Sequence, residues 1–355
     1  MICLILQNDI RLISRIDPKM ITSAQLKASV LNVNTQNFDD LALNIFRFQA
    51  QNNVTYAKYL KYLQVDVSKV QSIKDIPFLP IEFFKTQTIL SGEVQPKVIF
   101  ESSGTTGQNT SRHLVADPDF YLQIAEQIFE KFYGKLAEFQ ILALLPSYLE
   151  RNNSSLVYMV EHFIKQSKSQ DSGFYLNNYN ELATTLKRIA SENSSKKILL
   201  IGVTFGLLDF AEAGLDLSFL QIFQHLTVME TGGMKGRRKE LLREEVHEIL
   251  TNAFYVDKIH SEYGMTELLS QGYSFGEGIF DLPPSMKILL RDVNDPFNVQ
   301  HQTRGGINVI DLANVDSCSF IETKDLGSFI PASRQFRVLG RFDNSDIRGC
   351  NLMIL

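Results

Sequence analysis

The chain has 355 residues, of which 44% are hydrophobic and 21% are charged, and its net charge is −5 at pH 7. This composition is typical of a soluble globular protein, and the acidic balance argues against nucleic acid as the main partner. The three cysteines, Cys3, Cys318 and Cys350, are far apart and odd in number. That spacing excludes a disulfide framework and a zinc site and indicates a reducing, cytoplasmic compartment. The apolar run Met1–Leu6 is too short for a signal peptide or a membrane span.

The first hundred residues predict two helices between less regular segments. Residues 1–40 carry weak patterns that favour a strand followed by irregular structure. Apolar residues then recur at helical spacing from Phe38 to Tyr62, which predicts two helices separated near Asn52-Asn53. The prolines of Ile76–Pro80 exclude a regular helix and predict an extended segment.

From Lys97 onward, short apolar runs alternate with helical patterns. The expected strands are 97–100, 140–145, 174–176, 197–201 and 226–229. The expected helices are 118–133, 156–164, 181–190, 207–213, 219–225 and 239–253. This alternation predicts an α/β fold with mainly parallel strands layered with helices. From Tyr273, short β-like runs predict a smaller β-rich lobe, so we expect an α/β body over 1–271, the lobe over 272–340 and a hinge-like tail over 341–355.

A loop rich in small residues follows the strand expected at 97–100. Gly104 and Gly107 let the backbone turn and approach a ligand closely. Consecutive backbone N–H groups in such a turn form an anion nest. Hydroxyl donors are added by Ser102, Ser103, Thr105 and Thr106. The pattern predicts a phosphate-binding loop, although no Gly-Lys-Ser/Thr closes it as in a P-loop; the alternative is an ordinary polar loop.

Ligands of open α/β sheets bind at the carboxyl ends of strands, so other loops that follow strands are candidates. The loop 230–239 carries the pair Gly232-Gly233 and four basic residues, for which a solvated basic turn is the alternative. The loop 261–267 offers Tyr263 to stack on a base and Glu267 as an oxygen ligand for magnesium.

Two further residues near the end of the chain suit a nucleotide. Asp325 can accept hydrogen bonds from both hydroxyls of a ribose, and Arg341 can reach a phosphate or the same sugar. Each of these features is weak evidence on its own. We therefore expect the loops and these two residues to line one pocket between the body and the β-rich lobe.

Together these motifs resemble a known superfamily. Ser103-Gly-Thr-Thr-Gly107, Tyr263-Gly-Met-Thr-Glu267, Asp325 and Gly340-Arg-Phe-Asp343 are similar in order and spacing to the motifs of adenylate-forming enzymes. Further motifs narrow the resemblance to the acyl-protein synthetase family, the acid-activating subunit of the bacterial luminescence fatty-acid reductase. Those motifs are the loop 102–107 together with Ser111-Arg-His113, the stretch 146–156, and Arg348-Gly-Cys350. The resemblance runs from about Phe46 to the last residue, and residues 1–40 carry none of it.

The resemblance implies the large-domain fold of adenylate-forming enzymes, with ATP and Mg²⁺ as cofactors. The loop 102–107 would hold the ATP phosphates. Adenine would lie against Gly232 and Gly233 and stack on Tyr263, beside Gly264. Thr266 would contact the α-phosphate, Glu267 the magnesium and Asp325 the ribose, and Arg341 would also bind the nucleotide. Contacts to the acid are expected from residues that also fit a structural role, namely His113, Tyr148, Asn153, Ser154 and Met234.

Two departures from the superfamily pattern affect the expected mechanism. Gln108 and Asn109 stand where a lysine is usual, so Arg112 is the expected substitute. The superfamily continues into a mobile lid with a catalytic lysine, whereas this chain stops twelve residues after Asp343. The lid is therefore expected to be absent or supplied by a partner.

The expected reaction is ATP-dependent activation of a fatty or related carboxylic acid, followed by transfer of the acyl group to a protein thiol. Cys350 is the expected acceptor because chain ends are mobile unless tied down. A buried structural role is its alternative, favoured by the apolar residues 352–355. The first alternative is a ligase that transfers the acyl group to coenzyme A or a carrier protein in surface-sugar or lipid biosynthesis. The second alternative is a nucleotide-binding module that has no catalytic activity. The resemblance implies an acyl-accepting protein or a reductase as partner.

Overall fold

The computed structural model describes residues 21–102, 110–145, 153–175, 178–192, 196–232, 241–299 and 303–342. The chain forms two compact units. Unit 1 is built from the two ends of the chain, with residues up to 97, residues 106–117 and residues from 284 onward. Unit 2 is built from residues 98–105 and 118–283. The domain boundaries at residues 271 and 340 stay a prediction.

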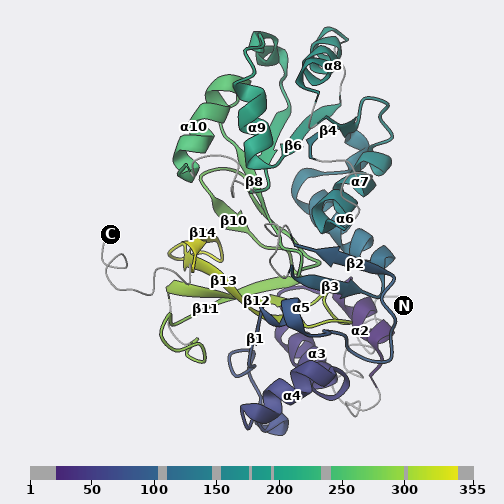
Figure 1. Ribbon diagram of the computed structural model, residues 1–355, viewed down its shortest axis with the longest axis vertical. Helices are drawn as coiled ribbons and strands as arrows, with labels where there is room; N and C mark the ends of the chain where they lie inside the picture. Colours follow the sequence, from purple (N-terminus) through teal and green to yellow (C-terminus); the bar gives the residue numbers. More distant parts are fainter. Residues whose placement is uncertain are drawn as a thin grey trace, which may run out of the picture. The chain divides into compact units, whose positions relative to one another are not determined.

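Unit 2 is organised around a mainly parallel sheet (Figure 1). Its central strands pair in parallel in the order β4 (Phe139–Leu144), β6 (Lys197–Gly202), β7 (Leu226–Glu230) and β8 (His260–Tyr263). The shorter strands at its two edges are β5 (Gly173–Phe174), β9 (Gly272–Ser274) and β10 (Ile279–Asp281). All six residues of β4 are buried, because helices cover a parallel sheet on both faces.

Helices lie on both sides of this sheet. They are α6 (Pro118–Tyr133), α7 (Ser155–Ser167), α8 (Tyr179–Ser191), α9 (Thr204–Ala211) and α10 (Arg243–Phe254). Figure 1 shows α6 and α7 along one side and α9 and α10 along the other. Apolar side chains of α8, α9 and α10 share one core with Leu142, Leu200 and Val228 of the sheet. The strand β2 (Val98–Glu101) also belongs to this unit.

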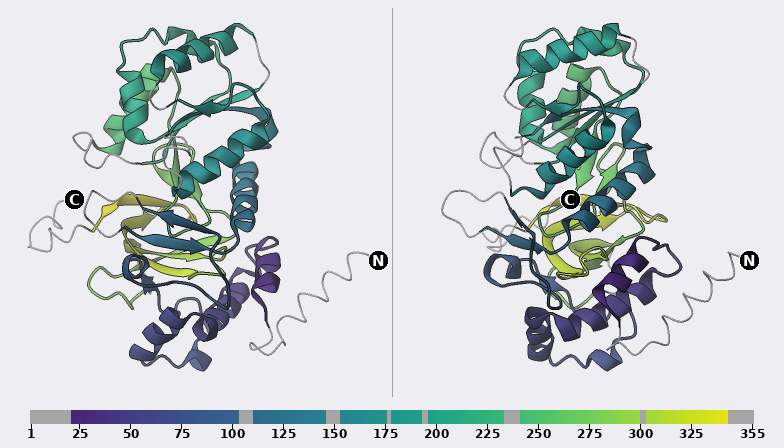
Figure 2. Two further views of the ribbon diagram at one scale, coloured as in Figure 1. Left: turned by 45° about the vertical axis from the view of Figure 1, so that its right-hand side comes forward. Right: turned by 90° about the vertical axis from the view of Figure 1, so that its right-hand side faces the viewer.

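Unit 1 contains an antiparallel sheet with helices on one face (Figure 2). Its strands are β11 (Met286–Arg291), β12 (Arg304–Asp311), β13 (Phe320–Phe329) and β14 (Phe336–Arg341), each paired with the next, together with β1 (Leu79–Pro80), which is parallel to β13. Its other elements are α2 (Ser23–Val30), α3 (Phe38–Asn52), α4 (Val54–Tyr62), α5 (Phe83–Thr86) and β3 (Arg112–Val115). The rings of Phe46, Tyr56 and Phe320 pack together and join α3 and α4 to β13.

The predicted α/β class is confirmed, and four local predictions are wrong. Residues 23–30 form helix α2 rather than irregular structure, because Thr22 and Gln25 form a capping box and Lys27 forms ion pairs with Asp117 and Asp316. The helix expected at 219–225 is only a short 3₁₀ turn, Ser218–Ile222. Helix α10 begins at Arg243 instead of Lys239, and β3 was not expected.

No helix in the described part of the chain combines the length and the apolar character that crossing a bilayer requires.

Candidate functional site

The candidate residues of unit 2 gather at the carboxyl edge of its parallel strands. Gly202, Glu230 and Ser261 lie side by side in register across β6, β7 and β8. Gly232 follows β7, and the motif Tyr263–Glu267 closes β8 and continues beyond it. Because neighbouring parallel strands end at the same edge, loops far apart in the sequence meet there. The structure thus brings two of the predicted adenine and phosphate motifs together.

The motif after β8 has a restricted geometry. The Tyr263 side chain is buried, and its ring packs on Phe280 with the centroids 5.8 Å apart. A Cβ atom at position 264 would collide with the carboxylate of Glu262, so only glycine leaves that carboxylate its place. Glu267 is only 5% exposed. Stacking of Tyr263 on adenine and the contact of Thr266 with a phosphate stay predictions.

The donor set at Glu267 fits magnesium that is bound together with phosphates. Among the described residues, no group of three or more His, Cys, Asp or Glu side chains is placed to hold a metal ion. Magnesium usually keeps several waters and binds through one or two carboxylates plus substrate phosphates, rather than in an all-protein cage. A single buried carboxylate beside Thr266 is compatible with that mode of binding.

The end of β2 lies beside two predicted acid-binding residues. The backbone N–H of Glu101 donates to the Asn153 carbonyl at 2.7 Å, and Asn153 Nδ2 donates to Glu101 Oε2 at 2.6 Å. Ser102, the first residue of the predicted phosphate-binding loop, directly follows Glu101, which is hydrogen-bonded to Asn153. The Ser154 hydroxyl caps α7 by accepting from the N–H of Val157 at 3.4 Å. Both residues have observed structural contacts, and their contacts with an acid stay predictions.

In unit 1 two predicted nucleotide-binding residues, Asp325 and Arg341, form a pair. Asp325 on β13 lies opposite Arg341 on β14 in the strand register, and Arg341 Nε is 3.2 Å from Asp325 Oδ1. The Asp325 side chain is buried, whereas the Arg341 side chain is 53% exposed. Thr323 accepts from the N–H of Asp325 at 3.1 Å and donates to the carbonyl of Ile307 at 2.8 Å, which holds this part of β13 in place.

Arg112 and His113 lie on β3 with opposite exposure. Arg112 is exposed, which suits a residue expected to reach a phosphate. His113 is buried, and its ring packs edge-on against Phe84 at 5.7 Å. The role of His113 at the substrate stays a prediction, and the contact seen here is a core contact within unit 1.

Several predicted residues lie outside the described part of the chain. They are Ser103, Gly104, Thr105, Thr106, Gly107, Tyr148, Gly233, Met234 and Cys350. Their assigned roles stay predictions.

Two glutamates at this edge of unit 2 escaped the sequence analysis. Burial alone would raise the pKa of Glu230, but His247, Ser261, Arg243 and the N–H of Gly232 together lower it to about 2. Burial first, and then the charge of Glu230, raise the pKa of Glu262 to about 8. The sequence does carry a signal for both glutamates. One directly follows the apolar run 226–229, and the other directly precedes Tyr263. A carboxylate at the end of a strand that is expected to be buried needs partners, which marks such positions as candidates.

Replacing Glu262 with glutamine is expected to stabilise the protein at alkaline pH. A carboxyl whose folded pKa lies above its ordinary 4.5 costs stability as the pH rises from 4.5 to about 8. Glutamine does not titrate, so the variant should gain about 4 kcal/mol over wild type between pH 5 and pH 8.5, the equivalent of roughly three pH units at about 1.4 kcal/mol each. Thermal unfolding across this pH range measures the gain, with exposed Glu248→Gln as the control. A difference that does not grow with pH would contradict the shift.

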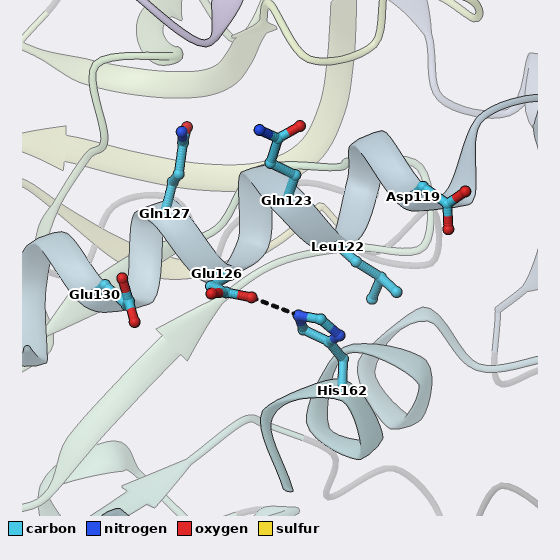
Figure 3. A pocket seen from close by; sticks show the side chains of 7 residues that line it. All are labelled: Asp119, Leu122, Gln123, Glu126, Gln127, Glu130 and His162. Carbon is cyan, nitrogen blue, oxygen red and sulfur yellow. Dashed lines mark hydrogen bonds and ion pairs between the residues drawn. The ribbon is translucent and has the colours of Figure 1, made fainter. Parts of the chain in front are cut away.

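A pocket on the outer face of α6 contains none of the candidate residues (Figure 3). Its lining comes from α6 and from His162 of α7. Glu126 Oε2 accepts from His162 Nε2 at 2.7 Å, and Glu130 forms an ion pair with Lys135. These acidic side chains are already compensated by the protein, so the pocket gives no reason to place the site there.

Comparison with known proteins relates this geometry to one family. A family model described as acyl-protein synthetase, LuxE, matches residues 2–355. The match therefore includes the first forty residues, in which the sequence analysis found no motif of the family. No curated protein sequence matches the chain.

Solved structures show the same fold at low identity. The 2-hydroxyisobutyryl-CoA ligase in complex with 2-HIB-AMP and CoA, in its thioesterification state, gives a TM-score of 0.64 at 14% identity, over 87% of this chain and 69% of the ligase. The same ligase in the postadenylation state with 2-HIB-AMP gives 0.63 at 12% identity, with the same coverage. ATP-bound MatB from Rhodopseudomonas palustris gives 0.49 at 14% identity, and the chain spans only 47% of its length. Since the family model matches nearly every residue, the chain belongs to the acyl-protein synthetase family, LuxE.

Proposed function

We propose that this chain activates a carboxylic acid with ATP as an acyl-adenylate and transfers the acyl group to a protein thiol. The observation that carries the proposal is the meeting of the Gly232 turn with the Tyr263–Glu267 motif at one edge of the parallel sheet. The membership in the acyl-protein synthetase family supports it. So does the fold shared with a ligase that was solved with an acyl-adenylate.

The first step forms the mixed anhydride. A carboxylate oxygen of the acid attacks the α-phosphorus of ATP, the bond from that phosphorus to the oxygen bridging to the β-phosphate breaks, and pyrophosphate leaves. Little covalent work falls to the protein, so positioning and charge neutralisation carry the rate. Magnesium, when bound at Glu267, supplies positive charge near the phosphates. Thr266 and Arg112 orient and neutralise phosphate oxygens in this proposal.

The second step moves the acyl group to sulfur. A thiolate attacks the carbonyl carbon of the adenylate, the bond from that carbon to the AMP oxygen breaks, and AMP leaves as a thioester forms. Cys318 is unsuited to this step, because burial raises the pKa of its thiol to about 12 and the side chain is fully enclosed. The proposed acceptor is Cys350, and a fatty acid is the proposed substrate.

The test of the first step is ATP–pyrophosphate exchange across a panel of carboxylic acids of increasing chain length. We expect exchange of radioactive pyrophosphate into ATP that depends on a long-chain acid and on magnesium. The control is the same panel without acid. If ATP binds but no acid supports exchange, the chain is a nucleotide-binding module and the proposal fails.

A further inference from the structure

The carboxylate of Glu230 stands at the centre of the unit 2 edge and is 7% exposed. We propose that Glu230 is a positioning residue that fixes the turn forming one wall of the adenine site and thereby sets the affinity for the base of ATP. This inference rests on the proposed function for the identity of the ligand. It is supported by hydrogen bonds of Glu230 and its neighbours Thr204 and Gly232, none of which takes part in the proposed reaction.

The first wall is the turn that follows β7. Glu230 Oε2 accepts from the N–H of Gly232 at 2.7 Å and from the Thr204 hydroxyl at 3.1 Å. The Gly232 carbonyl in turn accepts from the N–H of Thr204 at 2.9 Å. One carboxylate oxygen therefore ties the turn after β7 to the start of α9. Gly232 has φ +74°, a left-handed conformation that favours glycine.

The charge of Glu230 makes these bonds strong. Oε1 lies 3.9 Å from His247 Nε2, and Arg243 adds positive charge from the same helix, α10. Although burial opposes ionisation, these partners hold the pKa of Glu230 well below its usual range. Its hydrogen bonds are therefore charge-assisted, which makes them about twice as strong as neutral ones.

The second wall is Tyr263, which is supported from the side of α10 by Phe280 and Arg243. The guanidinium of Arg243 lies over the Phe280 ring, 5.4 Å from its centroid, and Phe280 packs on Tyr263. The positive charge of Arg243 also acts on the Glu230 carboxylate. Since Glu230 holds the first wall directly and the second wall has its own support, a change at Glu230 shifts one wall of the slot for a base and leaves the other in place.

The test compares ATP with inorganic tripolyphosphate as ligands of the Glu230→Gln variant. Glutamine keeps the shape of the side chain but removes the charge. We expect the dissociation constant for ATP, measured by calorimetry, to rise about tenfold, the equivalent of one charge-assisted hydrogen bond. Binding of tripolyphosphate should be unchanged, because that ligand has no base. In exchange assays the KM for ATP should rise by the same factor, with kcat within about twofold of wild type.

Matched variants keep the test decisive. Thr204→Val removes one of the two bonds to Oε2 and should weaken ATP binding in the same direction but less; it replaces Glu230→Gln if that variant does not fold. Exposed Glu248→Gln on α10 is the control and should bind both ligands as wild type does. Equal weakening of ATP and tripolyphosphate, or unchanged ATP binding, overturns the inference.

The outcomes for wild type separate this inference from the proposed function. If wild type binds ATP but catalyses no exchange, the proposed function fails while the binding comparison still decides the role of Glu230. If wild type supports exchange and Glu230→Gln binds ATP normally, only the inference fails. If wild type does not bind ATP, both fail.

Discussion

Glu267→Gln is expected to lower the rate of ATP–pyrophosphate exchange by at least about a hundredfold, since the charge stabilisation that a bound metal supplies is worth several kcal/mol. The amide has nearly the same shape as the buried carboxylate but is a poorer ligand for a hard cation. The variant should therefore unfold at about the same temperature as wild type. Exchange is measured as a function of magnesium concentration, and the loss should be largest where magnesium is limiting.

The control for this experiment is Glu248→Gln, which removes an exposed carboxylate from α10 of the same unit. It should leave exchange and its magnesium dependence as in wild type. Normal exchange by Glu267→Gln at limiting magnesium would show that the carboxylate does not bind the metal. A large fall in unfolding temperature would instead show that Glu267 serves the fold.

The second large effect is expected for Cys350→Ser, which should keep ATP–pyrophosphate exchange and lose thioester labelling altogether. Activation of the acid needs no thiol, whereas its transfer does, so the change separates the two steps. Labelling is measured with radioactive fatty acid plus ATP, followed by treatment with hydroxylamine, which cleaves thioesters. Arg348 next to Gly349-Cys350 should favour the thiolate, which is the reactive form.

Two further cysteine variants control this prediction. Cys318→Ala should label as wild type does, because its buried thiol with a pKa of about 12 is neither accessible nor ionised. Cys3→Ser tests the remaining cysteine. A thioester on Cys350→Ser would assign the acceptor to another cysteine. A wild type that never labels but consumes coenzyme A would favour the ligase alternative.

The sequence by itself determined most of the elements and the order of the motifs. Helices α3 and α4 were predicted with their break at Asn53, because apolar residues recur at helical spacing on both sides of it, and the Asn53 side chain caps α4. The strands β4, β6 and β7 were predicted because buried parallel strands are continuous apolar runs. The family was recognised from short motifs, since their residue types and spacing are local properties of the chain.

Only the tertiary structure decided which groups from distant parts of the chain meet. Helix α2 has a short, weak pattern and is held by ion pairs of Lys27 with Asp117 and Asp316, which lie far along the sequence. The pairing of Asp325 with Arg341 depends on the register of β13 and β14, and the bond from Thr204 to Glu230 depends on which strands are neighbours. A shift of one residue in the register of β13 and β14 would turn Asp325 and Arg341 to opposite faces of the sheet and break the pair.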